Sequence, residues 1–184
     1  MSKYKIKKLK ENALKFLDKC EFYDCNYRLS TNSEISPYAT CFAVFTRNLI
    51  KDQTLINDSS KFEKNIITSI KKEHLRMNLR GKPFRQLLCF SLSALSILDE
   101  SKPALLNDYV KQQLNLYNLD NPLNELGSLE GIPGSGNQAM FYAVFLIHAR
   151  KYLDINTTLE IDNWISNHIL HSNSFGLWGK TNNL

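Results

Sequence analysis

The fold is decided by the stretch Gly134-Ser-Gly-Asn-Gln-Ala-Met-Phe-Tyr-Ala-Val-Phe-Leu-Ile-His-Ala149. A glycine-rich turn leads directly into a segment that would be apolar on nearly every side of a helix. Two earlier segments, Pro37–Ile50 and Pro83–Leu98, have the same character. A helix that is apolar all round needs neighbours on most of its sides. The sequence therefore predicts three buried, inner helices.

Amphipathic segments alternate with these three. The first covers Tyr4–Cys20, and its apolar residues recur at helical spacing; they are Ile6, Leu9, Ala13, Phe16, Leu17 and Cys20. Three more are expected after Ser60-Lys-Phe-Glu63, which reads as a capping box, after Ser101-Lys-Pro103, and after Thr157. The prediction is an all-α fold of about seven helices arranged as helical hairpins, with inner apolar and outer amphipathic members and a repeat of about forty to fifty residues. No segment alternates apolar and polar residues for long enough to predict a strand.

The 184 residues fit a single all-α domain, 1–184, interrupted by one long loop at 118–136 that holds four of the seven glycines. No apolar run reaches the ~20 residues that span a bilayer. The basic N-terminus lacks the apolar core of a signal peptide, and Cys41 and Cys89 lie in apolar helical runs as expected of reduced thiols. These features favour a cytoplasmic protein.

The formal net charge is +5, and seven lysines fall between Lys3 and Lys19. Such a cluster allows binding to nucleic acid or to an acidic surface. The lysines lie on the polar sides of amphipathic helices without interleaved aromatic residues, however, so a solvated outer face is favoured and nucleic-acid binding is not expected.

Two short motifs carry a resemblance. Gly134-Ser-Gly-Asn-Gln138 enters an inner helix, and Gly176-Leu-Trp-Gly179 follows the last outer one. With the alternation of helices, they resemble the α/α-toroid proteins: terpenoid cyclases, protein prenyltransferases, and the toroid domains of polysaccharide lyases and glycosidases. The chain supplies fewer helices than a complete ring, so the resemblance implies a partial α/α toroid, a truncated member, or a ring completed by self-association.

The chain also departs from these families. Ser172 stands where the triterpene cyclase repeat has glutamine, and neither D-x-D-D nor D-D-x-x-D occurs. The Cys-His zinc ligands of the prenyltransferases have no counterpart. The only closely spaced histidines, His168 and His171, lack a third ligand, so neither a metal nor a cofactor is expected.

The resemblance places a functional pocket at the mouth of the ring, where inner helices begin. There we expect ligand-binding residues Tyr38, Arg85, Asn137 and Gln138, with Trp178 stacking on a sugar from the rim. Helix N-termini and a guanidinium both suit anions. Glu125 and Glu130 in the long loop are the candidate acid or base groups, while the alternative is that these polar residues cap helices or face solvent. His148 reads as a hydrogen-bonded core residue.

Three hypotheses follow. The first is a toroid-like protein that binds or processes a polar saccharide or related anionic ligand at the N-terminal ends of the inner helices. The second is a non-catalytic interaction or scaffold protein completed by self-association or by a partner. The third is a lipid or isoprenoid pocket lined by Phe42, Phe45, Phe90 and Phe141. The residues do not decide between an enzyme and a binding protein.

Overall fold

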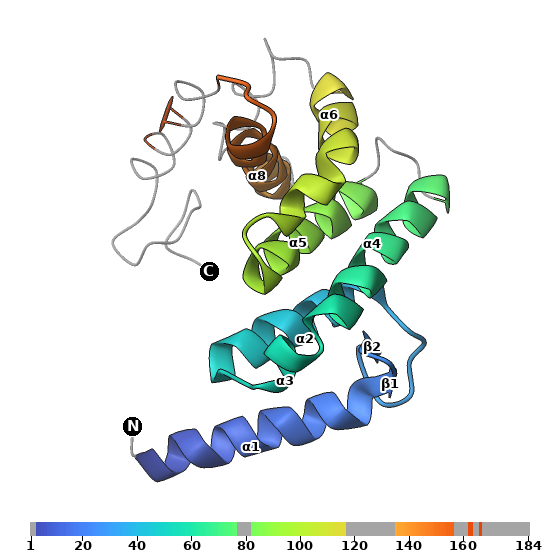
Figure 1. Ribbon diagram of the computed structural model, residues 1–184, viewed down its shortest axis with the longest axis vertical. Helices are drawn as coiled ribbons and strands as arrows, with labels where there is room; N and C mark the ends of the chain where they lie inside the picture. The colour runs from blue at the N-terminus through green and yellow to red at the C-terminus, as the bar shows by residue number, and fades with distance from the viewer. Residues whose placement is uncertain (1–2, 77–81, 117–134, 157–161, 164–165, 167–184) are drawn as a thin grey trace. The chain divides into compact units, whose positions relative to one another are not determined.

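The computed structural model describes residues 3–76, 82–116, 135–156, 162–163 and 166. Helices dominate them, which confirms the all-α class (Figure 1). The elements, in chain order, are α1 Lys3–Cys20, β1 Glu21–Tyr23, β2 Asn26–Tyr27, α2 Pro37–Ile50, α3 Thr54–Asn57, α4 Ser59–Arg76, α5 Lys82–Leu98, the 3-10 helix η1 Lys102–Leu106, α6 Asn107–Leu116 and α8 Ser135–Tyr152. Within the described residues, no helix combines the length and apolar character that crossing a bilayer requires.

The backbone groups into two compact units. Unit 1 comprises Met1–Asn78 and Phe90–Leu106, and unit 2 comprises Leu79–Cys89 and Asn107–Leu184. The boundary between them falls inside α5. That the chain is one domain stays a prediction, as does the toroid arrangement of its helices.

Unit 1 contains a β-hairpin that the sequence did not predict. β1 and β2 pair antiparallel, with Glu21 opposite Tyr27 and Tyr23 opposite Asn26. Asp24 and Cys25 between them have φ of 46° and 61°, the positive values that a tight type I′ hairpin turn requires. Strands of three and two residues are too short to show alternation, and the turn lacks the glycine that normally signals positive φ.

α2 is buried on most sides, as predicted. Its buried residues are Ala39, Thr40, Cys41, Ala43, Val44 and Arg47. Ser36 occupies the N-cap position with an extended backbone, but its side chain makes no capping hydrogen bond. Lys51, at φ 58°, ends the helix in the left-handed conformation, and its N–H bonds back to the carbonyls of Arg47 and Asn48.

The sequence predicts that the helix after residue 60 buries an apolar stripe of Phe62, Ile66, Ile67 and Ile70; α4 buries Phe62, Ile66 and Ile70, and Ile67 is half-buried. The capping box is wrong, however. The helix begins at Ser59, directly after the short α3, and the Glu63 carboxylate pairs instead with Lys102 Nζ at 2.9 Å.

The fifth predicted helix is divided. It opens as η1 and continues as α6. The apolar side expected of this helix included Leu105, Leu106 and Val110; Leu106 and Val110 are buried, but Leu105 is 56% exposed.

In unit 2, α8 confirms the helix predicted directly after Gly134. Its buried residues include Phe141, Tyr142, Phe145, Leu146 and Ala149, and it packs against α6. Of the helix predicted after Thr157, only residues 162–163 and 166 are described, so the rest of it lies outside the described residues.

Candidate functional site: a groove along α4

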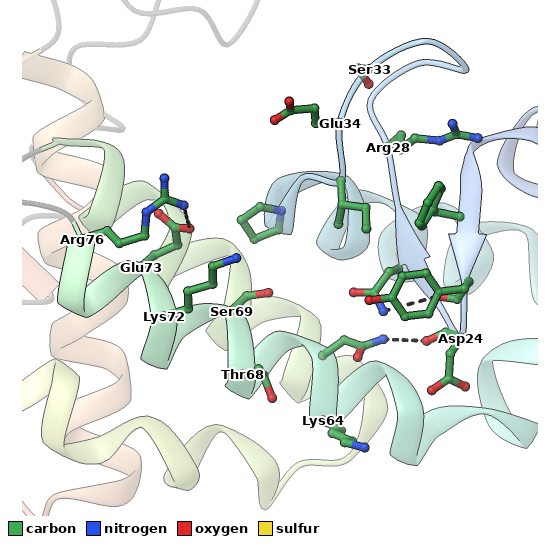
Figure 2. Close-up of a pocket in the computed structure, with 16 residues that line it drawn as sticks. Asp24, Arg28, Ser33, Glu34, Lys64, Thr68, Ser69, Lys72, Glu73 and Arg76 are labelled. Carbon is green, nitrogen blue, oxygen red and sulfur yellow. Dashed lines mark hydrogen bonds and ion pairs between the residues drawn. The ribbon is translucent and has the colours of Figure 1, made fainter.

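A groove of about 830 Å³ runs along α4 in unit 1. Its other walls are the β-hairpin, the loop after β2 and the first residue of α2, Pro37 (Figure 2). We call it the α4 groove. It is open to solvent and large enough for a ligand of several rings.

Seven polar residues of α4 line one wall in two rows. Lys64, Thr68, Lys72 and Arg76 form one row, and Asn65, Ser69 and Glu73 form the other. Residues four apart share a helix face, so both rows follow from the sequence spacing, as does the buried row of Phe62, Ile66 and Ile70 next to them. At 1.5 Å per residue, the row from residue 64 to residue 76 extends about 18 Å.

The opposite wall carries exposed aromatic rings. Phe22 and Tyr23 of β1 are 57% and 58% exposed, and their ring centroids lie 5.3 Å apart, edge to face. The Arg28 guanidinium carbon lies 5.3 Å from the Phe22 centroid, a cation–π contact. Asn26, Ser33 and Glu34 add polar groups to the same wall.

The groove has an excess of one positive charge, since four basic side chains face three acidic ones. Glu73 pairs with Arg76 at 3.3 Å, and Asp24 pairs with Lys61 at 3.6 Å. Among the described residues, Lys64 and Lys72 have no ion-pair partner, and neither does Glu34. The uncommitted charge along α4 is therefore basic.

Arg47 positions the hairpin that forms one wall. This residue of α2 is only 3% exposed. Its Nε and Nη2 donate to Tyr27 Oη at 3.2 and 2.9 Å, Nη1 pairs with Asp52, and Nη2 lies 3.3 Å from Asp18 Oδ1. We call Arg47, Tyr27, Asp18, Glu21 and Asp52 the Arg47 cluster.

Glu21 completes this cluster from β1. Tyr27 Oη donates to Glu21 Oε2 at 3.1 Å, and the backbone N–H of Cys25 donates to Glu21 Oε1 at 3.0 Å. α1, the hairpin, α2 and the loop between α2 and α3 are thus joined through one guanidinium. Burial alone would lower the pKa of Arg47, but the hydrogen bonds to Tyr27 and Asp52 raise it above its ordinary value, so the arginine stays charged.

The predicted pocket residues fall in different units. Tyr38 lies in the first turn of α2 in unit 1, where burial raises the pKa of its hydroxyl, but it does not line the α4 groove. Arg85 is a half-buried residue of α5 in unit 2. Asn137 and Gln138 are in the first turn of α8, also in unit 2, and their side chains lie outside the described residues.

Glu125, Glu130, Trp178, His168 and His171 also lie outside the described residues, so their roles stay predictions. The α4 groove shares one feature with the predicted pocket, because Pro37 brings the N-terminal end of an inner helix to its edge.

Three of the four phenylalanines proposed as a lipid pocket contact one another in unit 1. The Phe42–Phe90 ring centroids are 5.3 Å apart, and both Phe42 and Phe90 lie 6.3 Å from Phe45. Phe141 belongs to unit 2. The three rings pack edge to face or tilted, the arrangements that aromatic pairs prefer; Phe45 and Phe90 are half-buried and Phe42 is exposed.

The four cysteines are free and buried, as predicted for Cys41 and Cys89. Burial raises the pKa of Cys25 to about 11 and that of Cys41 to about 12. Both thiols are therefore protonated at neutral pH and are poor nucleophiles. In the described ranges, no group of three or more histidine, cysteine or carboxylate side chains is arranged to hold a metal ion.

His148 is the hydrogen-bonded core residue that the sequence predicted. Its Nε2 lies 2.7 Å from Asn107 Oδ1, and its ring centroid lies 4.7 Å from that of Tyr152. Burial lowers its pKa to about 4, so the ring is neutral at pH 7 and Nε2–H donates to the amide oxygen.

Comparisons with protein-family models, with curated protein sequences and with solved structures gave no match.

Proposed function

We propose that the protein binds an extended acidic saccharide in the α4 groove. One observation carries this proposal: Lys64, Thr68 and Lys72 on α4, which make no ion pair with the described residues, line the same groove as two exposed aromatic rings on the hairpin.

The two walls match the two aspects of a sugar. A saccharide presents hydroxyl groups along its edges and apolar C–H groups on its ring faces. Thr68, Ser69 and Asn65 can exchange hydrogen bonds with hydroxyls, and Tyr23 offers an aromatic face for stacking. Lys64 and Lys72 would then bind the carboxylates of a uronic sugar, which distinguishes an acidic chain from a neutral one.

The groove also fits an extended ligand better than a compact one. Its polar row covers about three turns of α4, with the two unpaired lysines two turns apart. A repeating acidic oligomer presents charges at intervals and so can meet both lysines at once. We also propose a toroid fold and a cytoplasmic location. The alternation of apolar and amphipathic helices supports the fold, and the free, buried cysteines support the location.

The test is a calorimetric titration of the full chain with an oligogalacturonate hexamer, compared with a neutral maltohexaose. We expect binding of the acidic hexamer and much weaker binding of the neutral one. Lys72→Gln should weaken binding about tenfold, which corresponds to about 1.4 kcal/mol.

The matched control is Lys71→Gln, which removes the same charge from the neighbouring exposed position of α4 that does not line the groove. It should leave the affinity unchanged. Equal affinity for the two hexamers, or equal losses from the two substitutions, would contradict the proposal.

A second candidate function is that of an interaction protein, and a separate apolar groove favours it. This groove of about 160 Å³ lies between α1, α2 and the loop after β2, with a floor of Ala13, Ala39 and Ala43. Phe16, Leu29 and Phe42 at its rim are each at least 40% exposed. If a second copy covers it, light scattering will show a dimer that Phe42→Glu dissociates; a monomer at all concentrations would exclude self-association.

A further inference from the structure

α1 is the most basic element that the structure describes. Its 18 residues contain seven lysines but only two acids, Glu11 and Asp18, and its first turn holds no acidic residue. The N-terminal end of a helix carries a partial positive charge, which lysines there reinforce rather than offset. This half of α1 therefore presents concentrated positive charge.

Three residues of the apolar stripe of α1 are left uncovered, two of them in this N-terminal half. Leu17 and Cys20, near the C-terminal end, are 7% and 1% exposed, as the amphipathic pattern predicted. Ile6, Leu9 and Phe16 are 39%, 63% and 54% exposed. Residues 6, 9, 13 and 16 lie on one side of a helix, so the exposed side chains form a continuous strip rather than scattered positions.

Four lysines of α1 at residues 7, 8, 10 and 15 make few or no interactions with the described residues. Lys7 is 4.0 Å from Glu11 in an exposed pair, and Lys10 Nζ donates to the carbonyl of Ile50 at 3.4 Å. Exposed pairs of this kind contribute at most about 1 kcal/mol. Neither Lys8 nor Lys15 has an ion-pair partner among the described residues.

We propose that α1 docks the protein on an anionic lipid surface. Ile6, Leu9 and Phe16 enter the boundary between headgroups and acyl chains, and the long lysine side chains around the rest of the helix extend to the lipid phosphates and carboxylates. A basic helix with an exposed apolar strip has the composition of an interfacial helix. Each lysine near an anionic surface contributes about 1 kcal/mol of attraction.

The apolar strip decides between a lipid surface and other anionic partners. A nucleic acid would satisfy the lysines but leave Leu9 and Phe16 in water, whereas a bilayer satisfies both. The helix is also formed before it binds, since Leu17 and Cys20 are buried and Asp18 pairs with Arg47 at 3.3 Å. Docking therefore does not require the ordering of a disordered segment, which would oppose it.

The experiment is co-sedimentation of the full chain with vesicles of phosphatidylcholine alone or of an equimolar mixture with phosphatidylserine. We expect binding to the mixed vesicles only, and its loss at high salt, because screening shortens the reach of the lysines. Leu9→Glu should reduce the bound fraction at least about tenfold, since it places a charge in the apolar strip.

The matched control is Leu75→Glu, which makes the same change at a leucine of α4 that is 85% exposed. It should bind as the unmodified chain does, and circular dichroism will show that both variants keep their helices. Equal binding to neutral vesicles, or equal effects of the two substitutions, overturns the proposal. It is also overturned if Leu9→Glu dissociates an oligomer without lipid, or if RNA binds more tightly than the vesicles and Leu9→Glu does not weaken it.

Discussion

Each of the two units buries a polar side chain on an apolar helix, but they do so in opposite ways. In unit 1, Arg47 of α2 keeps its charge and is surrounded by Tyr27 and by carboxylates from α1, β1 and the loop between α2 and α3. In unit 2, His148 of α8 is neutral and has Asn107 as its hydrogen-bond partner.

The difference shows that the neighbouring charges and hydrogen-bond partners, not the helix that carries the side chain, decide whether a buried group is charged. A buried charge survives where opposite charges and hydrogen bonds replace its water. Where no opposite charge is near, burial lowers the pKa of a basic group such as the His148 imidazole, and the group is neutral at pH 7. Arg47 consequently links four segments, whereas His148 joins two helices through one amide.

The largest effect is expected at Arg47. Arg47→Leu leaves Asp52 and Glu21 partly buried without their cation, so we expect the free energy of unfolding to fall by about 3–5 kcal/mol in urea denaturation. Arg47→Lys keeps the positive charge but loses the forked guanidinium that contacts Tyr27 and Asp52 together. Its unfolding free energy should therefore lie between those of the unmodified protein and Arg47→Leu. A loss below about 1 kcal/mol for Arg47→Leu would contradict the role of this cluster.

The next effect is the response of unit 2 to acid. The pKa of His148 is lowered by burial from 6.5 to about 4, so the unfolded chain takes up a proton at higher pH than the folded one. Stability should therefore be lost as the pH falls from about 6.5 to about 4, by about 3 kcal/mol at 1.36 kcal/mol per pKa unit.

His148→Gln keeps a donor for Asn107 but cannot titrate. The unfolding free energy of the unmodified protein, relative to that of His148→Gln, should fall as the pH drops across that interval and stay constant below it. If the difference is the same at pH 7 and pH 4.5, His148 is not buried in its neutral form.

The labelling rates of the cysteines report on the burial of both units in one experiment. Raising the pKa of Cys25 from 9.0 to about 11 lowers its thiolate fraction about a hundredfold at pH 8, and burial slows its labelling further. We expect the native protein to react slowly with a disulfide reagent at Cys25 and Cys41 in unit 1 and at Cys89 in unit 2. In Arg47→Leu, labelling should accelerate more in unit 1 than in unit 2, and mass spectrometry of the labelled peptides measures which cysteine reacts first. Rapid, equal labelling of all four cysteines in the native protein would contradict their burial.

The smallest effect is expected at Ser36. Replacing a serine N-cap by alanine typically costs about 1 kcal/mol, but this side chain makes no capping hydrogen bond. Ser36→Ala should therefore change the unfolding free energy by less than about 0.5 kcal/mol. A full capping loss in thermal denaturation would show that the start of α2, rather than Arg47, holds this region of unit 1.

The sequence predicted the helices whose apolar pattern lies within one continuous segment of the chain. Pro37–Ile50, Pro83–Leu98 and the segment after Gly134 are apolar around most of the helix, and only burial on most sides satisfies that pattern. The hairpin at residues 21–27 was missed because positive φ at Asp24 and Cys25 is supported by distant contacts, such as that of Tyr27 with Arg47.

The α4 groove could be predicted only in part. The polar rows on α4 are visible in the spacing of Lys64, Thr68 and Lys72, but they read equally as a solvated face. What turns this face into a groove is the hairpin beside it, whose position depends on carboxylates 29 residues before and five residues after Arg47 in the chain. Such pairings leave no periodic signal.

The most direct test of the α4 groove is a nuclear magnetic resonance titration of the nitrogen-15-labelled chain with the oligogalacturonate hexamer. The amide signals of residues 22–28, 33–36 and 64–76 should shift in proportion to the occupancy of the groove. Those of α8 should stay in place. Shifts confined to α8, or uniform small shifts over the whole chain, would show that the ligand does not bind along α4.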